Sequence, residues 1–145
     1  MTTSAENLGR FASALMAGQL LKASTRKEML RPFIRIGTLH QFAQKADEGE
    51  GAEAKAVGLA YGVGWGLLTK TRFGPAFFKE GHGDGAQTYI ICFPKRQVCM
   101  ILLTNSDNGE LAFRPLMETI WGNTVTPWEW ECYTPGCIEA SRKAQ

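Results

Sequence analysis

The fold of this chain is decided by residues 87–104, which read QTYIICFPKRQVCMILLT. Two runs rich in Ile, Val, Tyr, Cys and Leu, residues 87–93 and 98–104, flank a turn that contains Pro94. Aromatic and β-branched residues favour strands, and a short connection with proline favours an antiparallel hairpin. We therefore expect the two runs to pair as neighbouring antiparallel strands.

Two earlier segments extend this hairpin. Between residues 61 and 67, Tyr, Val, Trp and Leu alternate with glycine, which is the period-two pattern of a strand with one nearly bare side. Residues 75–79 form the next expected strand. Together these segments predict an antiparallel β-meander of three to four strands.

Helical patterns lie before and after the meander. Apolar residues recur at helical spacing from Leu8 to Met16, after a Thr3-x-x-Glu6 sequence that has the form of a capping box. This pattern predicts an N-terminal helix over residues 4–17.

Two further helices follow from the same signals. Residues 111–121 are amphipathic and are followed by Gly122, and residues 25–31 form a short helix with Ser24 as its N-cap and Pro32 after it. The chain is therefore expected to be an α+β protein of the α/β sandwich type, with the N-terminal and C-terminal helices packed on the sheet.

The remaining segments complete the expected organisation. Residues 44–56 are polar and are interpreted as a mobile loop. The aromatic stretch 127–130 is expected to pack against the rest of the fold, and residues 138–145 are expected to be a frayed end. We expect one domain over residues 1–131 and a C-terminal tail over residues 132–145.

Composition excludes several classes of protein. The 145 residues carry 16 Lys and Arg against 14 Asp and Glu, and a net charge of +2 gives no electrostatic case for nucleic acid. No apolar run approaches the roughly 20 residues that span a bilayer, so no membrane partner is expected. The first residues show no export signal, but the compartment stays unassigned because an address in a preceding segment would change it.

Four cysteines are present, at positions 92, 99, 132 and 137. None belongs to a C-x-x-C motif and the chain has only two histidines, so neither a metal site nor a cofactor is expected. The expected hairpin places Cys92 opposite Cys99, and Cys132 and Cys137 flank a turn short enough to be stapled. Free thiols that behave as small buried apolar side chains are nevertheless expected, particularly for the first pair.

Four stretches of the sequence suggest a family when they are taken together. They are TSAENLGRF (residues 3–11), YGVGWG (61–66), GHGDG (81–85) and LLTNSDNG (102–109). In order and spacing they resemble the C-terminal part of the serine β-lactamase-like family, which includes class C β-lactamases, penicillin-binding proteins and related esterases. The resemblance covers residues 3–131 and implies a partial β-lactamase/transpeptidase-like fold.

The resemblance also implies a site. In this family a Ser in an S-x-x-K motif attacks an acyl carbonyl, and a Lys-Thr-Gly or His-x-Gly strand faces that Ser. His82 would replace the Lys of the strand motif, the N–H of Gly85 would be the oxyanion donor, and Gly83 and Asp84 would contact substrate. Asp84 departs from the family's glycine, so its side chain would block the acyl group or repel a substrate carboxylate. The alternative is that His82 is a hydrogen-bonded structural group.

Two other motifs match catalytic patterns but occur in the wrong order along the chain. Ser24-Thr25-Arg26-Lys27 has the form S-x-x-K, yet it follows the stretch that resembles the region after the family's second motif. Ser106-Asp107-Asn108 has the form S-D-N, yet it follows the strand motif. We interpret Ser24 as a helix cap with Lys27 in solvent, and the second motif as a turn and N-cap.

The resemblance therefore implies the C-terminal segment of a serine hydrolase that lacks the nucleophile, the Lys and the Tyr. Such a chain would be inactive alone and would meet a small acyl substrate only when completed by an N-terminal segment. The alternative is a non-catalytic binding or assembly module that acts through oligomerisation. Because an incomplete sheet leaves an open edge, a homo-oligomer or a partner polypeptide is expected.

Overall fold

A computed structural model describes residues 3–41, 51–123 and 125–143. Six strands pair antiparallel in sequence order, from β1 to β6, to form one sheet. The strands are β1 Ile34–Arg35, β2 Leu59–Tyr61, β3 Gly66–Leu68, β4 Ala76–Gly83, β5 Ala86–Phe93 and β6 Val98–Thr104. The expected α+β class with an antiparallel meander is confirmed, and short strands raise the strand number from the expected three to four to six.

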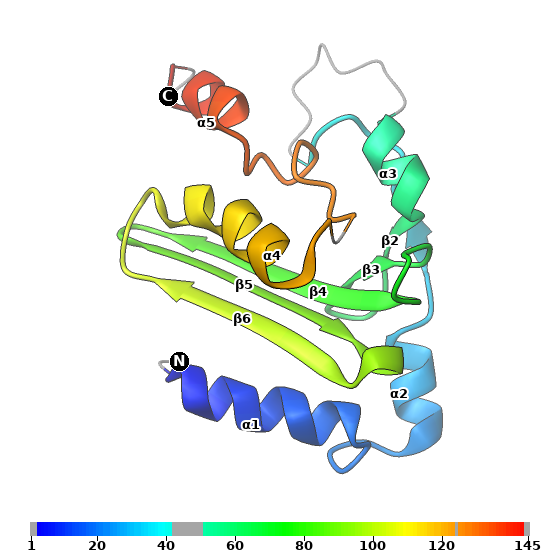
Figure 1. Cartoon of the computed structure of the whole chain (residues 1–145). Coiled ribbons are helices and arrows are strands. Elements are labelled where there is room, and N and C mark those ends of the chain that lie inside the picture. The colour runs from blue at the N-terminus through cyan, green and yellow to red at the C-terminus, as the bar shows by residue number, and fades with distance from the viewer. Residues whose placement is uncertain (1–2, 42–50, 124, 144–145) are drawn as a thin grey trace.

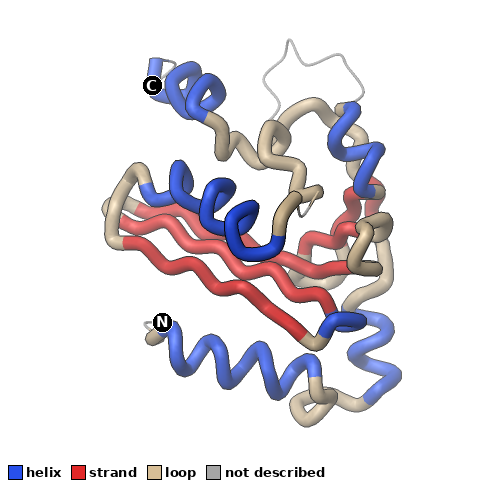
Figure 2. Tube along the Cα trace, in the orientation of Figure 1, coloured by secondary structure: helices blue, strands red, loops and turns tan. Residues whose placement is uncertain are grey.

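Helices cover both faces of this sheet (Figures 1 and 2). They are α1 Ala5–Met16, α2 Ala23–Met29, α3 Ala52–Val57, α4 Phe113–Trp121 and α5 Pro135–Lys143, with 3₁₀ turns η1 Pro94–Arg96 and η2 Gly109–Ala112. α1 and α2 lie on one face, while α3, α4 and the C-terminal segment (residues 125–143) lie on the other. Within the described ranges no helix is long and apolar enough to cross a bilayer.

Alternation along β4 and β5 sorts side chains between two cores. Phe78 and Tyr89 pack in the cluster under α4 and the C-terminal segment, whereas Phe77 and Ile90 pack in the cluster against α1. The period of two follows from the pleat of a strand. It places every second residue of β4 beyond Phe78 on the α4 face.

The glycine-rich stretch is two strands instead of one. Tyr61 of β2 pairs with Gly66 of β3, and Gly62 N donates to Trp65 O at 2.9 Å across the bend between them. A single strand over residues 61–67 was wrong because glycine alternation also suits a tight turn, and Gly64 takes a φ of 78° there. At Gly66 the absent side chain leaves room for the ring of Phe78 against the backbone.

Both predicted helix caps are shifted. The N-cap of α1 is Ser4, whose side chain accepts a hydrogen bond from Asn7 N at 3.2 Å, so the capping box at Thr3 is not formed. The N-cap of α2 is Lys22, which places Ser24 inside the helix. This early start accompanies a hydrogen bond of 3.1 Å from Arg26 Nη1 to Met16 O, which ties α2 to the end of α1.

Two segments expected to be irregular are helical. Residues 52–57 form α3, with Ala54 and Val57 buried in the core, while residues 42–50 lie outside the described part of the chain. α5 covers most of the end that was expected to fray, and its Ile138 is 7% exposed. Burial of apolar side chains stabilises both helices, which local polarity did not predict. The domain boundary expected after residue 131 stays a prediction.

The cysteines form two disulfides, Cys92–Cys99 and Cys132–Cys137, so the expectation of free thiols is wrong. The β5–β6 register pairs Cys92 directly with Cys99, with Cα atoms 4.0 Å apart. The second bridge ties the turn after Trp130 to α5. The expected hairpin correctly placed Cys92 opposite Cys99, and the prediction failed only in leaving the two thiols unbonded.

Intact, denatured protein is therefore expected to show no thiol reactive towards a maleimide before reduction and four after it. Opening the short Cys92–Cys99 loop is expected to cost about 2–3 kcal/mol, measured as the difference in unfolding free energy between the wild type and C92A/C99A. C132A/C137A, which removes the other disulfide, is the matched variant for comparison. Four reactive thiols in the unreduced protein would contradict the pairing.

Candidate active site at the His82 end of the sheet

The four residues expected to form the site lie together at one end of the sheet. His82 and Gly83 end β4, and Asp84 and Gly85 form the turn that leads into β5. All four are exposed. Gly83 pairs with Ala86 across this two-residue turn, and Gly85 takes a φ of 71°, which glycine adopts without a side-chain penalty.

The strand that carries His82 has a partly open edge. β3 pairs with β4 only as far as Phe78, which faces Gly66. From Lys79 onwards β4 pairs with β5 alone among the described strands. The imidazole therefore stands at a margin of the sheet, on the α4 face that Phe78 also occupies.

The N–H of Gly85 is already engaged. It donates to Oδ1 of Asp107 at 2.5 Å. Asp107 reaches it because Gln87 pairs with Thr104, which brings the turn after β6 beside the turn before β5. The Asp107 carboxylate therefore occupies the position in which the Gly85 N–H, as an oxyanion donor, would bind the negatively charged oxygen of a substrate.

The motif Ser106-Asp107-Asn108 forms the turn that the sequence predicts. Ser106 Oγ accepts a hydrogen bond from Asn108 N at 3.2 Å, as serine does in tight turns. Asn108 takes the N-cap position of η2 without a side-chain cap bond. Ser106 is thus a turn residue.

The imidazole of His82 is also engaged within the chain. Its Nε2 lies 3.2 Å from the hydroxyl of Tyr133, and the two rings are 5.5 Å apart. Tyr133 is 2% exposed and packs against Tyr89 and Phe113. A buried, well-packed phenol therefore orients the exposed imidazole.

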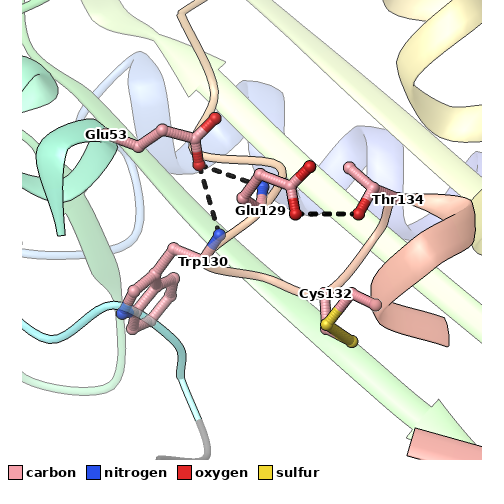
Figure 3. Close-up of a disulfide and its surroundings, with 6 residues drawn as sticks. Glu53, Glu129, Trp130, Cys132 and Thr134 are labelled. Carbon is pink, nitrogen blue, oxygen red and sulfur yellow. Dashed lines mark hydrogen bonds between the residues drawn. A yellow bond between two sulfur atoms is a disulfide. The ribbon is translucent and has the colours of Figure 1, made fainter. Parts of the chain in front are cut away.

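α3 holds the C-terminal segment in place. Oε2 of Glu53 accepts hydrogen bonds from Glu129 N at 2.9 Å and from Trp130 N at 3.2 Å (Figure 3). The same turn carries a hydrogen bond of 3.0 Å from Thr134 Oγ1 to Glu129 and the disulfide at Cys132. These contacts fix the turn, and they thereby position Tyr133, which lies three residues after Trp130.

Beneath Tyr133 lies a buried carboxyl cluster, which comprises Glu80 and Glu131 with the groups that hydrogen bond to them. Oε1 of Glu131 accepts from the Tyr89 hydroxyl at 3.0 Å. Oε1 of Glu80 accepts from Gln41 Nε2 at 2.5 Å, from the Tyr61 hydroxyl at 3.4 Å and from Lys79 Nζ at 3.5 Å. The second oxygen of each carboxyl is buried without a hydrogen-bond partner among the described residues.

Burial changes the ionisation of this cluster. Desolvation, reinforced by the Glu80 charge, raises the pKa of Glu131 well above its ordinary value of 4.5. Desolvation and the Glu80 charge also raise the pKa of Tyr61 to about 12, and desolvation raises the pKa of Tyr133 still further. The phenol of Tyr133 therefore stays protonated and can donate to Nε2 of a neutral imidazole.

The literal S-x-x-K motif is far from this site in the fold. Ser24 and Lys27 are exposed on α2, which packs with α1 on the opposite face of the sheet. No group of three or more His, Cys, Asp or Glu side chains within the described ranges gathers as a metal site requires. The described site therefore contains an imidazole, phenols and carboxyls, with no Ser-Lys pair beside them.

Comparison with known families bears on this arrangement. A family model described as Beta-lactamase matches residues 1–117. The chain belongs to the β-lactamase family. This is a family of serine hydrolases, and the match ends within α4. No curated protein and no solved structure gives a significant match to the chain.

Sequence reasoning missed three residues that contact either the His82–Gly85 stretch of this β-lactamase-family chain or the residues that pack beside it. Asp107 lies inside a stretch quoted for the resemblance, so its position after β6 was a usable signal. Tyr133 and Glu131 lie beyond the matched residues, and only the folded C-terminal segment brings them to His82 and Tyr89. The roles assigned to His82, Gly83, Asp84 and Gly85 stay predictions.

The raised pKa of Glu131 has a consequence for stability. A carboxyl whose pKa is higher in the folded than in the unfolded state binds more protons when folded, so stability falls as pH rises from about 4.5 through the folded-state value. Glu131→Gln keeps an acceptor for the Tyr89 hydroxyl and removes this titration. We expect the variant to gain more than about 1 kcal/mol over wild type between pH 5 and neutral pH.

Thermal unfolding followed by circular dichroism across this pH range measures the effect. Glu139→Gln, at an exposed position on α5, is the matched control and should keep the wild-type pH dependence. Parallel pH curves for the wild type and Glu131→Gln would contradict a raised pKa at Glu131.

Proposed function

We propose that this chain supplies the sheet wall of a β-lactamase-type acyl-hydrolase site, with the nucleophile provided by a separate segment. The observation that carries the proposal is the position of the His82–Gly85 stretch, which is exposed at a partly open margin of β4 within a family of serine hydrolases. In this proposal His82 assists proton transfer and the N–H of Gly85 stabilises the oxyanion. The described Ser-Lys pair on α2 lies on the wrong face to serve it.

A working site would have to exchange two internal contacts. Asp107 would leave Gly85 N so that the carbonyl oxygen of a substrate takes its place. Tyr133 would either release Nε2 of His82 or remain as the group that orients it. In this proposal the separate segment that carries the nucleophile would decide the substrate class, whether β-lactam, ester or peptide.

The proposal predicts no turnover of nitrocefin or a p-nitrophenyl ester by the chain alone. Turnover is expected when a separately produced family segment carrying Ser-x-x-Lys and a Tyr motif is added. In that mixture His82→Ala should lower the rate by about 10²-fold or more, because a positioned proton-transfer group contributes on that scale. Ser24→Ala is the control and should leave the rate unchanged.

Asp107→Asn sharpens this test. It removes the negative charge from the acceptor of the Gly85 N–H and should raise the rate of the mixture. Turnover by the chain alone that Ser24→Ala abolishes would overturn the proposal. Failure of every mixture would favour the second candidate.

The second candidate is a non-catalytic assembly module. It is favoured by the engagement of both site groups within the chain, since Gly85 N binds Asp107 and His82 binds Tyr133. It is also favoured by the sheet edge at β6, which has no neighbouring strand on its outer side among the described residues. Leu103 on this strand is exposed, and the helices α1 and α4 on the two faces of the sheet carry the exposed apolar side chains Phe11, Leu116 and Ile120.

Either candidate gives this edge a partner, because an unpaired strand with apolar neighbours favours association. We expect light scattering after gel filtration to show self-association at high concentration. Leu103→Lys should shift the protein towards monomer, because a charged side chain protects an edge strand, whereas Leu39→Lys in the loop after β1 should not. A strictly monomeric wild type at all concentrations would exclude the homo-oligomer.

A further inference from the structure

A pocket lies on the same face of the sheet as His82, at the opposite end of that face. Its volume is about 290 Å³ and it is lined by Phe73, Phe93, Arg96, Val98 and Trp121. It lies where the loop between β3 and β4 meets η1 at the end of α4. β5 has eight residues, so its two ends are roughly 23 Å apart at about 3.3 Å per residue, and His82 is at the other end.

Three rings form the wall of this aromatic pocket. Phe73 meets Phe93 edge to face at 5.2 Å, and Phe93 meets Trp121 edge to face at 5.7 Å. Phe93 is 1% exposed, whereas Phe73 and Trp121 are half-buried and present part of their surface to the pocket. Edge-to-face packing of this kind keeps the rings in defined positions.

The loop that carries Phe73 is held before any ligand binds. Thr71 Oγ1 donates to Gly74 O at 2.5 Å and accepts from Phe73 N at 3.1 Å. Arg72 Nη2 donates to Trp121 O at 2.8 Å and so joins this loop to the end of α4. A ligand would therefore meet a largely formed cavity, which lowers the entropic cost of binding.

Two guanidinium groups border the aromatic pocket, since Arg96 lines it and Arg72 lies over the Phe73 ring. Lys70 in the β3–β4 loop and Lys95 in η1 add positive charge to the same two segments. No acidic residue occurs over residues 69–79 or 87–106. Within the described part of the chain none of the four cations forms an ion pair, and Glu118 on α4 is already paired with Arg114.

Arg96 is the cation best placed to bind a ligand. Its guanidinium lies over the Phe73 ring at 5.3 Å from the centroid, at the boundary between the apolar wall and solvent. Arg72 also lies over Phe73, at 4.5 Å, but its guanidinium already donates to the backbone of α4. A guanidinium stacked on a ring keeps its N–H edge available for a carboxylate, which it binds in a bidentate manner.

We propose that the aromatic pocket binds a small organic carboxylate that carries one aromatic ring. The ring would pack against Phe93 and Trp121, and the carboxylate would bind the Arg96 guanidinium at the rim. The volume of about 290 Å³ is at the lower limit of ligand pockets, which restricts the ligand to about one ring with a short chain. This inference is independent of the proposed acyl-hydrolase site.

Titration of ¹⁵N-labelled protein with 3-phenylpropionate tests the proposal. The indole N–H resonance of Trp121 should shift and saturate with a Kd on the order of 1 mM, as expected for a ligand of this size. Two probes separate the contributions of charge and ring. 3-Phenylpropionamide keeps the ring without the charge, and acetate keeps the charge without the ring, so each should bind at least about tenfold more weakly.

Two variants locate the carboxylate. Arg96→Gln should weaken 3-phenylpropionate binding at least about tenfold and leave binding of the amide unchanged, because only the acid uses the guanidinium. Arg10→Gln on the exposed surface of α1 is the matched control and should change neither. Arg96 is exposed in a turn, so its replacement should leave the unfolding midpoint unchanged.

Several results would overturn the proposal. They are the absence of a saturable shift at Trp121, equal affinity for the acid and the amide, and unchanged binding by Arg96→Gln. Saturable shifts confined to Trp128 and Trp130, which lie in the C-terminal segment, would also overturn it, since they would place the ligand elsewhere.

Discussion

The two-residue turn Asp84-Gly85 closes the β4–β5 hairpin with Gly83 opposite Ala86, and the arrangement of the His82 end depends on that register. Because side chains alternate along a strand, a slip of one residue would turn Glu80 and His82 towards α1. Phe78 and Tyr89, which pack beside each other under α4, oppose such a slip because it would break their packing in the core on that face. The hairpin register therefore decides both the core and the site.

The second determinant is the C-terminal segment, which satisfies polar groups that the sheet buries. Glu131 enters the interior with the Tyr89 hydroxyl as its hydrogen-bond donor, and Glu53 supplies one carboxylate oxygen to two backbone N–H groups of the same turn. Unpaired buried polar groups are costly, so these bonds select one path for the chain. That path brings Tyr133 to His82. The segment belongs to the site although it lies beyond the residues that match the family.

The two ends of the α4 face differ in chemistry. At the His82 end, the hydroxyl of Tyr133 meets the imidazole above buried carboxyls, and burial keeps the phenols protonated. At the other end, aromatic rings are bordered by Arg72 and Arg96, and the two loops that meet there contain no acidic residue. The first environment suits proton transfer and polarisation of a carbonyl, and the second suits an apolar anion. A continuous core of aromatic and aliphatic side chains separates them.

Local patterns in the sequence were enough for the α+β class, for β6 and most of β5, for the end of α4 at Gly122, and for membership of the β-lactamase family. Each of these depends on residue types close together in the chain. The Cys92–Cys99 bridge, α3 and the early start of α2 were decided by tertiary structure, because the bridge depends on strand register and the two helices depend on contacts with other elements. The contacts of Asp107 with Gly85 and of Tyr133 with His82 join residues 22 and 51 positions apart. Their energies exist only once the sheet has paired and the C-terminal segment has packed, so no local pattern encodes them.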